Sequence, residues 1–85
     1  MRWQEVHEFL RKQPFEPFTM RLSTGQAYAV RHPEFAILTK TGVAVGVPAA
    51  GSKVPDRLVY CDLLHVVAIE PGDGSQDLPR KRRRA

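Results

Sequence analysis

The hydrophobic period of this chain changes once, at a pair of prolines. Before Pro14, the apolar residues Trp3, Val6 and Leu10 recur at helical spacing. After Pro17, apolar and polar residues alternate, which is the pattern of strands with one buried face. Proline cannot continue a helix and keeps the preceding residue extended, so the change is sharp. The chain should form one short helix followed by β-structure, and its 85 residues leave no room for a Rossmann pair or a TIM barrel.

The predicted helix covers residues 2–12 and is amphipathic. Acidic residues come early and basic residues late, which suits the helix dipole. Its apolar stripe, Trp3, Val6 and Leu10, is typical of a helix that packs on a domain. If the helix left the domain, the same stripe would be a docking interface for another protein.

Alternation continues to Pro71 and is broken by turn signals at 23–25, at 41–42 and over a longer loop at 48–56. Pro33 interrupts one alternating run and predicts a bend there, because proline cannot donate to a central ladder. Asp62 is placed to cap one helical turn through residues 63–65. The spacing indicates about five short strands, and a barrel is favoured because closure removes exposed edges.

The sequence resembles the Sm-like barrels, and among them the bacterial Hfq type, over roughly residues 3–71. Residues 18–25, FTMRLSTG, are similar to the first strand and turn of that family. Residues 66–71, VVAIEP, are similar to its closing strand, and Tyr60 lies where its second motif begins. The resemblance implies a ring-forming, RNA-binding barrel. The family's RNA-contacting Lys-His pair is not retained, because Cys61 and Asp62 stand at those positions, and an SH3-like barrel fits almost as well.

We therefore expect a mainly β protein with one N-terminal α-helix. Residues 1–71 would form the helix and a small five-stranded barrel of Sm-like or SH3-like type. Residues 72–85 would form a disordered basic tail.

The charge is concentrated in that tail. Five cations, namely Arg80, Lys81, Arg82, Arg83 and Arg84, are consecutive. The rest of the chain holds eight Lys and Arg against nine Asp and Glu, so it carries a net charge of −1. A run of this kind neutralises phosphates without reading sequence, and the alternative is a tail that only solubilises the protein.

Within the domain, Arg31, His32 and Phe35 lie together near the predicted bend. A cation beside an aromatic ring can stack a nucleobase, although Phe35 also suits a core position. These three residues and the tail cations are the predicted nucleic-acid contacts.

We expect no catalytic residue, metal site or cofactor. Cys61, Asp62 and His65 have the residue types of a nucleophilic site, but a cysteine beside an apolar strand is usually buried and inert. His7, His32 and His65 form no metal-ligand pair with a cysteine. A single cysteine and the lack of a long apolar run predict a soluble cytoplasmic protein without membrane contact.

These observations favour a non-enzymatic binding module with RNA as its ligand. The alternative is a protein-interaction or assembly module with no nucleic-acid ligand, which would form a homo-oligomer or bind another protein through an edge strand or the helical stripe. A small enzyme that uses Cys61 and His65 is the third hypothesis.

Overall fold

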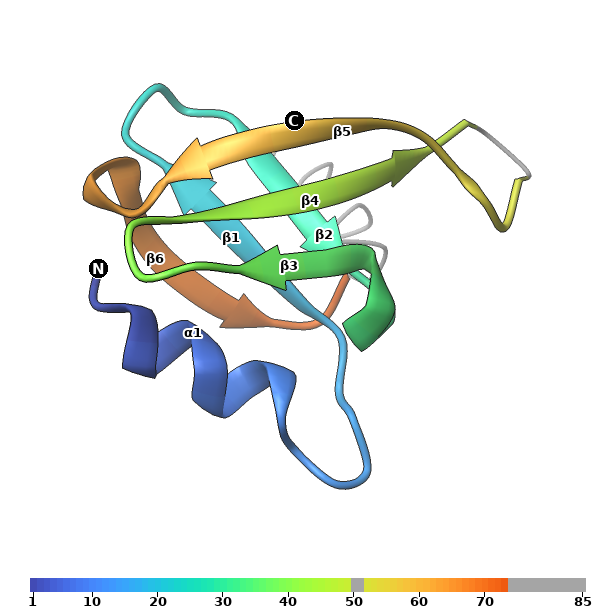
Figure 1. Cartoon of the computed structure of the whole chain (residues 1–85), viewed down its shortest axis with the longest axis horizontal. Helices are drawn as coiled ribbons and strands as arrows, with labels where there is room; N and C mark the ends of the chain where they lie inside the picture. Colours follow the sequence, from blue (N-terminus) through green and yellow to red (C-terminus); the bar gives the residue numbers. More distant parts are fainter. Residues whose placement is uncertain (50–51, 74–85) are drawn as a thin grey trace, which may run out of the picture.

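The computed structural model describes residues 1–49 and 52–73 of the chain (Figure 1). Over these ranges it contains one α-helix, six strands and two short 3₁₀ helices. In chain order they are α1 (Trp3–Leu10), β1 (Phe18–Leu22), β2 (Ala27–Val30), η1 (Pro33–Phe35), β3 (Ala36–Leu38), β4 (Gly42–Pro48), β5 (Pro55–Asp62), η2 (Leu63–His65) and β6 (Val66–Pro71). The predicted helix, the bend at Pro33 and the capped turn after Asp62 are therefore present.

The prediction of a closed five-stranded barrel is wrong. The six described strands form two separate antiparallel sheets of three strands each, in the orders β2-β1-β6 and β3-β4-β5. The chain crosses to the second sheet at η1 and returns at η2. Pro33 is the first residue of η1 and has no backbone N–H to donate to a strand ladder. The ladder between β1 and β2 therefore does not continue into β3. Asp62 ends β5 by accepting a hydrogen bond from the Leu64 backbone N–H at 2.9 Å.

The core lies between the two sheets and α1. Figure 1 shows the β3-β4-β5 sheet crossing in front of β1 and β2, with α1 along the lower side of the molecule. Both sheets, α1 and η2 contribute the buried apolar side chains, which are Val6, Phe18, Met20, Val30, Val43, Val45, Cys61, Leu63 and Val66. One continuous core therefore holds the two sheets and the helix together.

The helical stripe that sequence reasoning proposed as an interface packs inward. Val6 is fully buried, and Trp3 and Leu10 are half-buried against the core. The helix lies on the domain, so in this structure the stripe is a packing surface.

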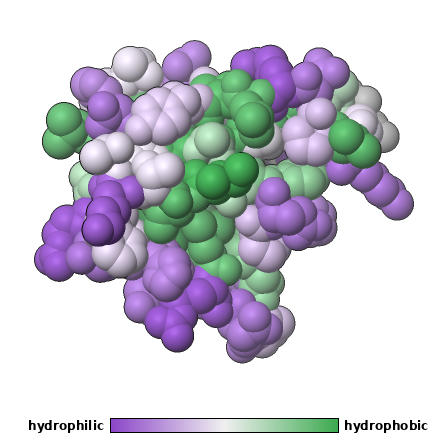
Figure 2. Space-filling model, viewed as in Figure 1, coloured by the Kyte–Doolittle hydropathy of each residue, from purple (hydrophilic) through white to green (hydrophobic). Residues whose placement is uncertain are grey.

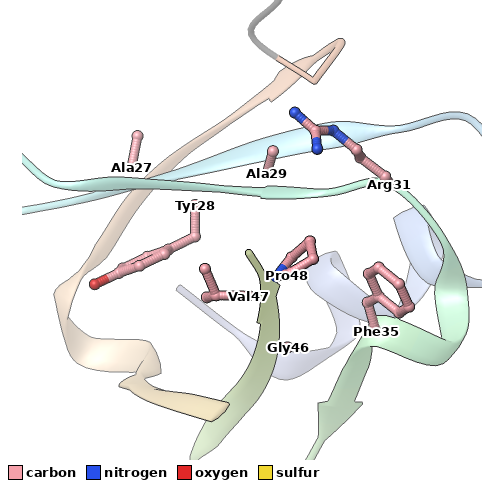
Figure 3. Close-up of a pocket in the computed structure, with 8 residues that line it drawn as sticks. All are labelled: Ala27, Tyr28, Ala29, Arg31, Phe35, Gly46, Val47 and Pro48. Atoms are coloured by element: carbon pink, nitrogen blue, oxygen red, sulfur yellow. The ribbon is translucent and has the colours of Figure 1, made fainter. Parts of the chain in front are cut away.

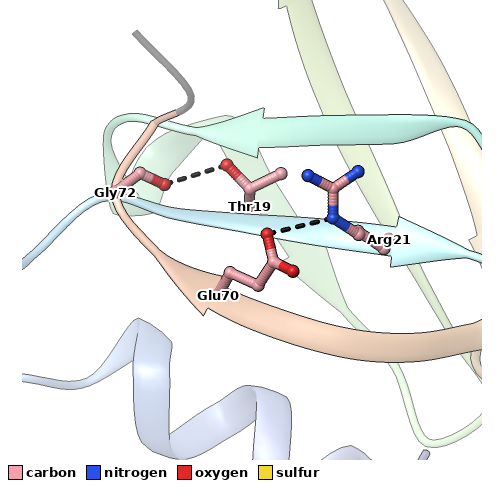
Figure 4. Close-up of polar contacts among 4 residues, drawn as sticks. All are labelled: Thr19, Arg21, Glu70 and Gly72. Carbon is pink, nitrogen blue, oxygen red and sulfur yellow. Dashed lines mark hydrogen bonds and ion pairs between the residues drawn. The ribbon is translucent and has the colours of Figure 1, made fainter. Parts of the chain in front are cut away.

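The end of the domain is held by polar contacts between β1 and β6 (Figure 4). The Thr19 hydroxyl donates to the Gly72 carbonyl at 2.9 Å, and Arg21 Nε lies 3.0 Å from a Glu70 carboxylate oxygen. Gly72 adopts a φ of 95°, a left-handed conformation that favours glycine. Thr19, which the alternation predicted as exposed, is therefore buried. The rest of the predicted tail, residues 74–85, lies outside the described residues.

Candidate functional site: a groove between the two sheets

A groove of about 320 Å³ lies where the end of β2 faces the end of β4 (Figure 3). Its walls are the rings of Tyr28, Phe35 and Pro48 and the side chain of Val47. Small residues complete it: Ala27, Ala29 and Gly46. The groove therefore has polar and apolar surface in similar amounts, and each of two different elements, β2 and η1, contributes an aromatic ring to it.

A second pocket, of about 400 Å³, adjoins the first. The two share Arg31, Phe35 and Pro48 as lining residues. The remaining lining residues of the second pocket are His32, Glu34, Ser52 and Lys53, so it holds more charged side chains than the first. The two pockets together form a surface with the Tyr28 and Phe35 rings along the first and charged side chains along the second.

The structure brings together the three predicted contacts of the domain. Arg31, His32 and Phe35 all line the second pocket. The His32 ring meets the Phe35 ring edge-on, with centroids 5.3 Å apart, so it supports the orientation of Phe35. Phe35 is half-buried and lines both pockets, so it does not belong to the set of fully buried core residues.

Arg31 lies at the rim of the groove. Figure 3 shows its guanidinium on the opposite side of β2 from the Tyr28 ring. Its Nε is 3.5 Å from a carboxylate oxygen of Asp73, and about half of the Arg31 side chain is exposed. The charge of Arg31 is therefore held at the mouth of the groove, beside Asp73.

Sequence reasoning missed Tyr28, Pro48 and Lys53. Tyr28 lies in a stretch of alternating residues, and Pro48 and Lys53 lie in the predicted loop at 48–56. The signal that identifies Tyr28 and Pro48 is topological, because β2 and β4 belong to different sheets and come together only in the folded domain. No spacing within the sequence carries that information.

The Cys61 hypothesis finds no support in this geometry. Cys61 is buried, and burial raises the pKa of its thiol, which disfavours the nucleophilic thiolate. Asp62 is engaged with the Leu64 backbone, and His65 Nδ1 lies 3.3 Å from the Ser23 hydroxyl.

Two other findings concern the described ranges. Within them, no group of three or more His, Cys, Asp or Glu side chains is arranged to hold a metal ion. No helix in the described part of the chain has the length and apolar character needed to cross a lipid bilayer.

The comparisons with known proteins give no relative. No protein-family model matches the chain, and neither a curated protein nor a solved structure matches it.

Proposed function

We propose that the chain is a non-enzymatic binding module for single-stranded RNA. The observation that carries this proposal is the groove, in which Tyr28 and Phe35 present aromatic rings and Arg31 lies at the rim. Unpaired bases stack on aromatic side chains and on guanidinium planes, and a slot of about 320 Å³ has room for a base. Single strands fit this site because their bases are free to leave the helical stack.

The charges around the groove suit a sugar-phosphate backbone that passes along its rim. Arg31 lies between the two pockets, and Lys53 lines the second one. Glu34 is on the same surface and opposes an anion there. The groove alone therefore offers few phosphate contacts, and most of the attraction would come from residues 80–84, since arginine-rich segments commonly bind RNA.

A cytoplasmic location is part of this proposal. The chain has one cysteine, and Cys61 is unpaired and buried in the core. A reducing compartment is the ordinary setting for such a protein.

Phe35→Ala tests the role of the groove. The variant should bind a fluorescently labelled single-stranded RNA about tenfold more weakly at low salt, because loss of one stacking ring costs about 1–3 kcal/mol. Fluorescence anisotropy measures the affinity, and circular dichroism confirms that the variant is folded. Leu64→Ala is the matched control, because Leu64 is 83% exposed and lies on η2, away from the groove lining. If the wild-type chain has no affinity for RNA at low salt, the proposal is wrong.

Asp73→Asn tests the role of the carboxylate at the mouth of the groove. Removing its charge should raise RNA affinity severalfold, because Asp73 competes with phosphate for Arg31. The same change in net charge is made by Asp56→Asn on β5, which does not line the groove. Anisotropy titrations of both variants separate the effect of breaking the Asp73–Arg31 ion pair from the effect of the change in net charge. Equal gains in the two variants would show that Asp73 has no special relation to the bound RNA.

A further inference from the structure

One carboxylate stands among the side chains that line the second pocket. Glu34 lines this pocket together with Arg31, Phe35 and Lys53. A carboxylate repels the phosphates of a bound strand, so at this place it weakens RNA binding unless it contacts the ligand in another way. A general affinity for RNA therefore leaves the presence of Glu34 unexplained.

The Glu34 carboxylate is available to accept hydrogen bonds. Within residues 1–49 and 52–73 it makes no ion pair or hydrogen bond. Asp56 shares this condition. The other described carboxylates have partners, and they belong to Glu5, Glu8, Glu16, Asp62, Glu70 and Asp73. Because an ionised carboxylate only accepts, both oxygens of Glu34 can bind donors of a ligand.

A single tight turn holds Glu34 next to Phe35. The two residues are consecutive in η1, and the Phe35 backbone N–H donates to the His32 carbonyl at 3.0 Å, which closes the turn. Pro33 restricts the backbone at the first position of the turn. Figure 2, drawn in the orientation of Figure 1, shows hydrophilic residues gathered where η1 lies. The turn is therefore open to a ligand, and its backbone is fixed, as a site that distinguishes bases requires.

The four bases offer different edges to a carboxylate. Guanine presents two adjacent donors, N1–H and the exocyclic N2 amino group, which match the two oxygens of a carboxylate. In adenine and cytosine the amino group adjoins a ring nitrogen that accepts, and in uracil the N3–H lies between two carbonyl oxygens. These acceptors repel a carboxylate, so guanine alone can bind it through two hydrogen bonds.

Building on RNA binding at this groove, we propose that Glu34 makes the second pocket selective for guanine. The base stacks on Phe35, and the Glu34 carboxylate accepts hydrogen bonds from its N1–H and its N2 amino group. The pocket, of about 400 Å³, has room for a purine. Lys53 lines the same pocket, so a basic side chain is disfavoured there and a nucleotide, which carries a phosphate, is favoured.

Four short labelled RNAs test this selectivity. In each of them uridine alternates with guanosine, inosine, adenosine or cytidine, and fluorescence anisotropy at low salt measures the affinity of the full chain. The guanosine RNA should bind about fivefold more tightly than the adenosine RNA, whose base is also a purine but has no adjacent pair of donors. Inosine keeps the N1–H and lacks the N2 amino group, so its RNA should bind with intermediate affinity.

Glu34→Gln should abolish the preference for guanosine. The amide keeps one acceptor and brings a donor against the donors of guanine, whereas it can form a donor–acceptor pair with adenine. The guanosine RNA should therefore bind the variant no more tightly than the adenosine RNA. Asp56→Asn is the matched control, because it removes the other carboxylate without a partner and Asp56 lines neither pocket. This control should keep the fivefold preference, and circular dichroism checks that both variants are folded.

The outcomes distinguish guanine selectivity from RNA binding itself. If the wild-type chain binds all four RNAs with equal affinity, RNA binding stands and guanine selectivity is wrong. If Glu34→Gln keeps the wild-type preference for guanosine, Glu34 does not read the base. If the wild-type chain binds none of the four RNAs, the proposed function fails, and guanine selectivity fails with it.

Discussion

Phe18→Ala should lower the free energy of unfolding by about 3–5 kcal/mol, the usual cost of removing a buried phenylalanine ring. Phe18 is 1% exposed and lies on β1, the central strand of its sheet. The rings of Phe9 and Phe15 pack against it, with centroids 5.3 Å and 6.0 Å away. These neighbours come from α1 and from the segment before β1, so the cavity would loosen the helix as well as the sheet.

The size of the domain makes this loss severe. A domain of ~70 residues has a free energy of unfolding of about 4–11 kcal/mol in total. Phe18→Ala therefore removes a large part of that free energy, and the variant should unfold at much lower urea concentration. Trp3 is the only tryptophan and is half-buried against the core, so its fluorescence reports the transition.

Val67→Ala is the control for this measurement. Val67 lies on β6 and is 61% exposed, so its truncation should change stability by no more than about 0.5 kcal/mol. A Phe18→Ala transition that coincides with that of the wild-type chain would contradict the packing described for α1 and β1.

The helix, the turns and the alternation of the strands could be predicted because residues close together in the sequence determine them. Pro14 and Pro17 separate the helix from the strands, and the Asp62 side chain caps the turn at η2. The β4 alternation of Val43 and Val45 toward the core follows directly from the sequence. Each of these features depends on residues that lie within a few positions of one another.

The arrangement of the strands could not be derived in the same way. Barrel closure needs ladders that join the edge strands β2 and β6 of one sheet to the edge strands β3 and β5 of the other, and whether these ladders form depends on how η1 and η2 direct the chain in space. The six short strands fit either one closed barrel or two sheets equally well as a sequence pattern. The same limit hid the groove, since Tyr28 and Pro48 become neighbours only through the way the two sheets pack.

Burial also departed from simple alternation where the chain contacts itself at long range. Thr19 is buried because Gly72 lies 53 residues further on and accepts its hydroxyl hydrogen bond. In the other direction, Ile37 and Leu58 are apolar residues of strands and yet are exposed. Alternation does not say which side of a strand faces the core, so their exposure could not be predicted from the sequence.

RNA affinity should fall about 60-fold when salt is raised from about 50 to about 200 mM. This figure follows if the chain engages about four phosphates of a single strand, because the logarithm of affinity then changes with the logarithm of salt by a slope of about −3. The described domain has balanced charges, so most of these contacts must come from residues 80–84. The titration is made by fluorescence anisotropy with one labelled single-stranded RNA.

A variant with glutamine at all five positions from 80 to 84 keeps the length of the chain and removes its cationic run. For this variant, the slope of the logarithm of affinity against the logarithm of salt should approach about −0.7, the value for one remaining phosphate contact at the groove. Phe35→Ala, in contrast, should lower affinity equally at every salt concentration, because stacking releases no counterions. If the glutamine variant keeps the wild-type slope, the tail does not contact phosphate. In that case the few cations around Arg31 would have to explain the whole electrostatic attraction, which the ion pair with Asp73 makes physically implausible.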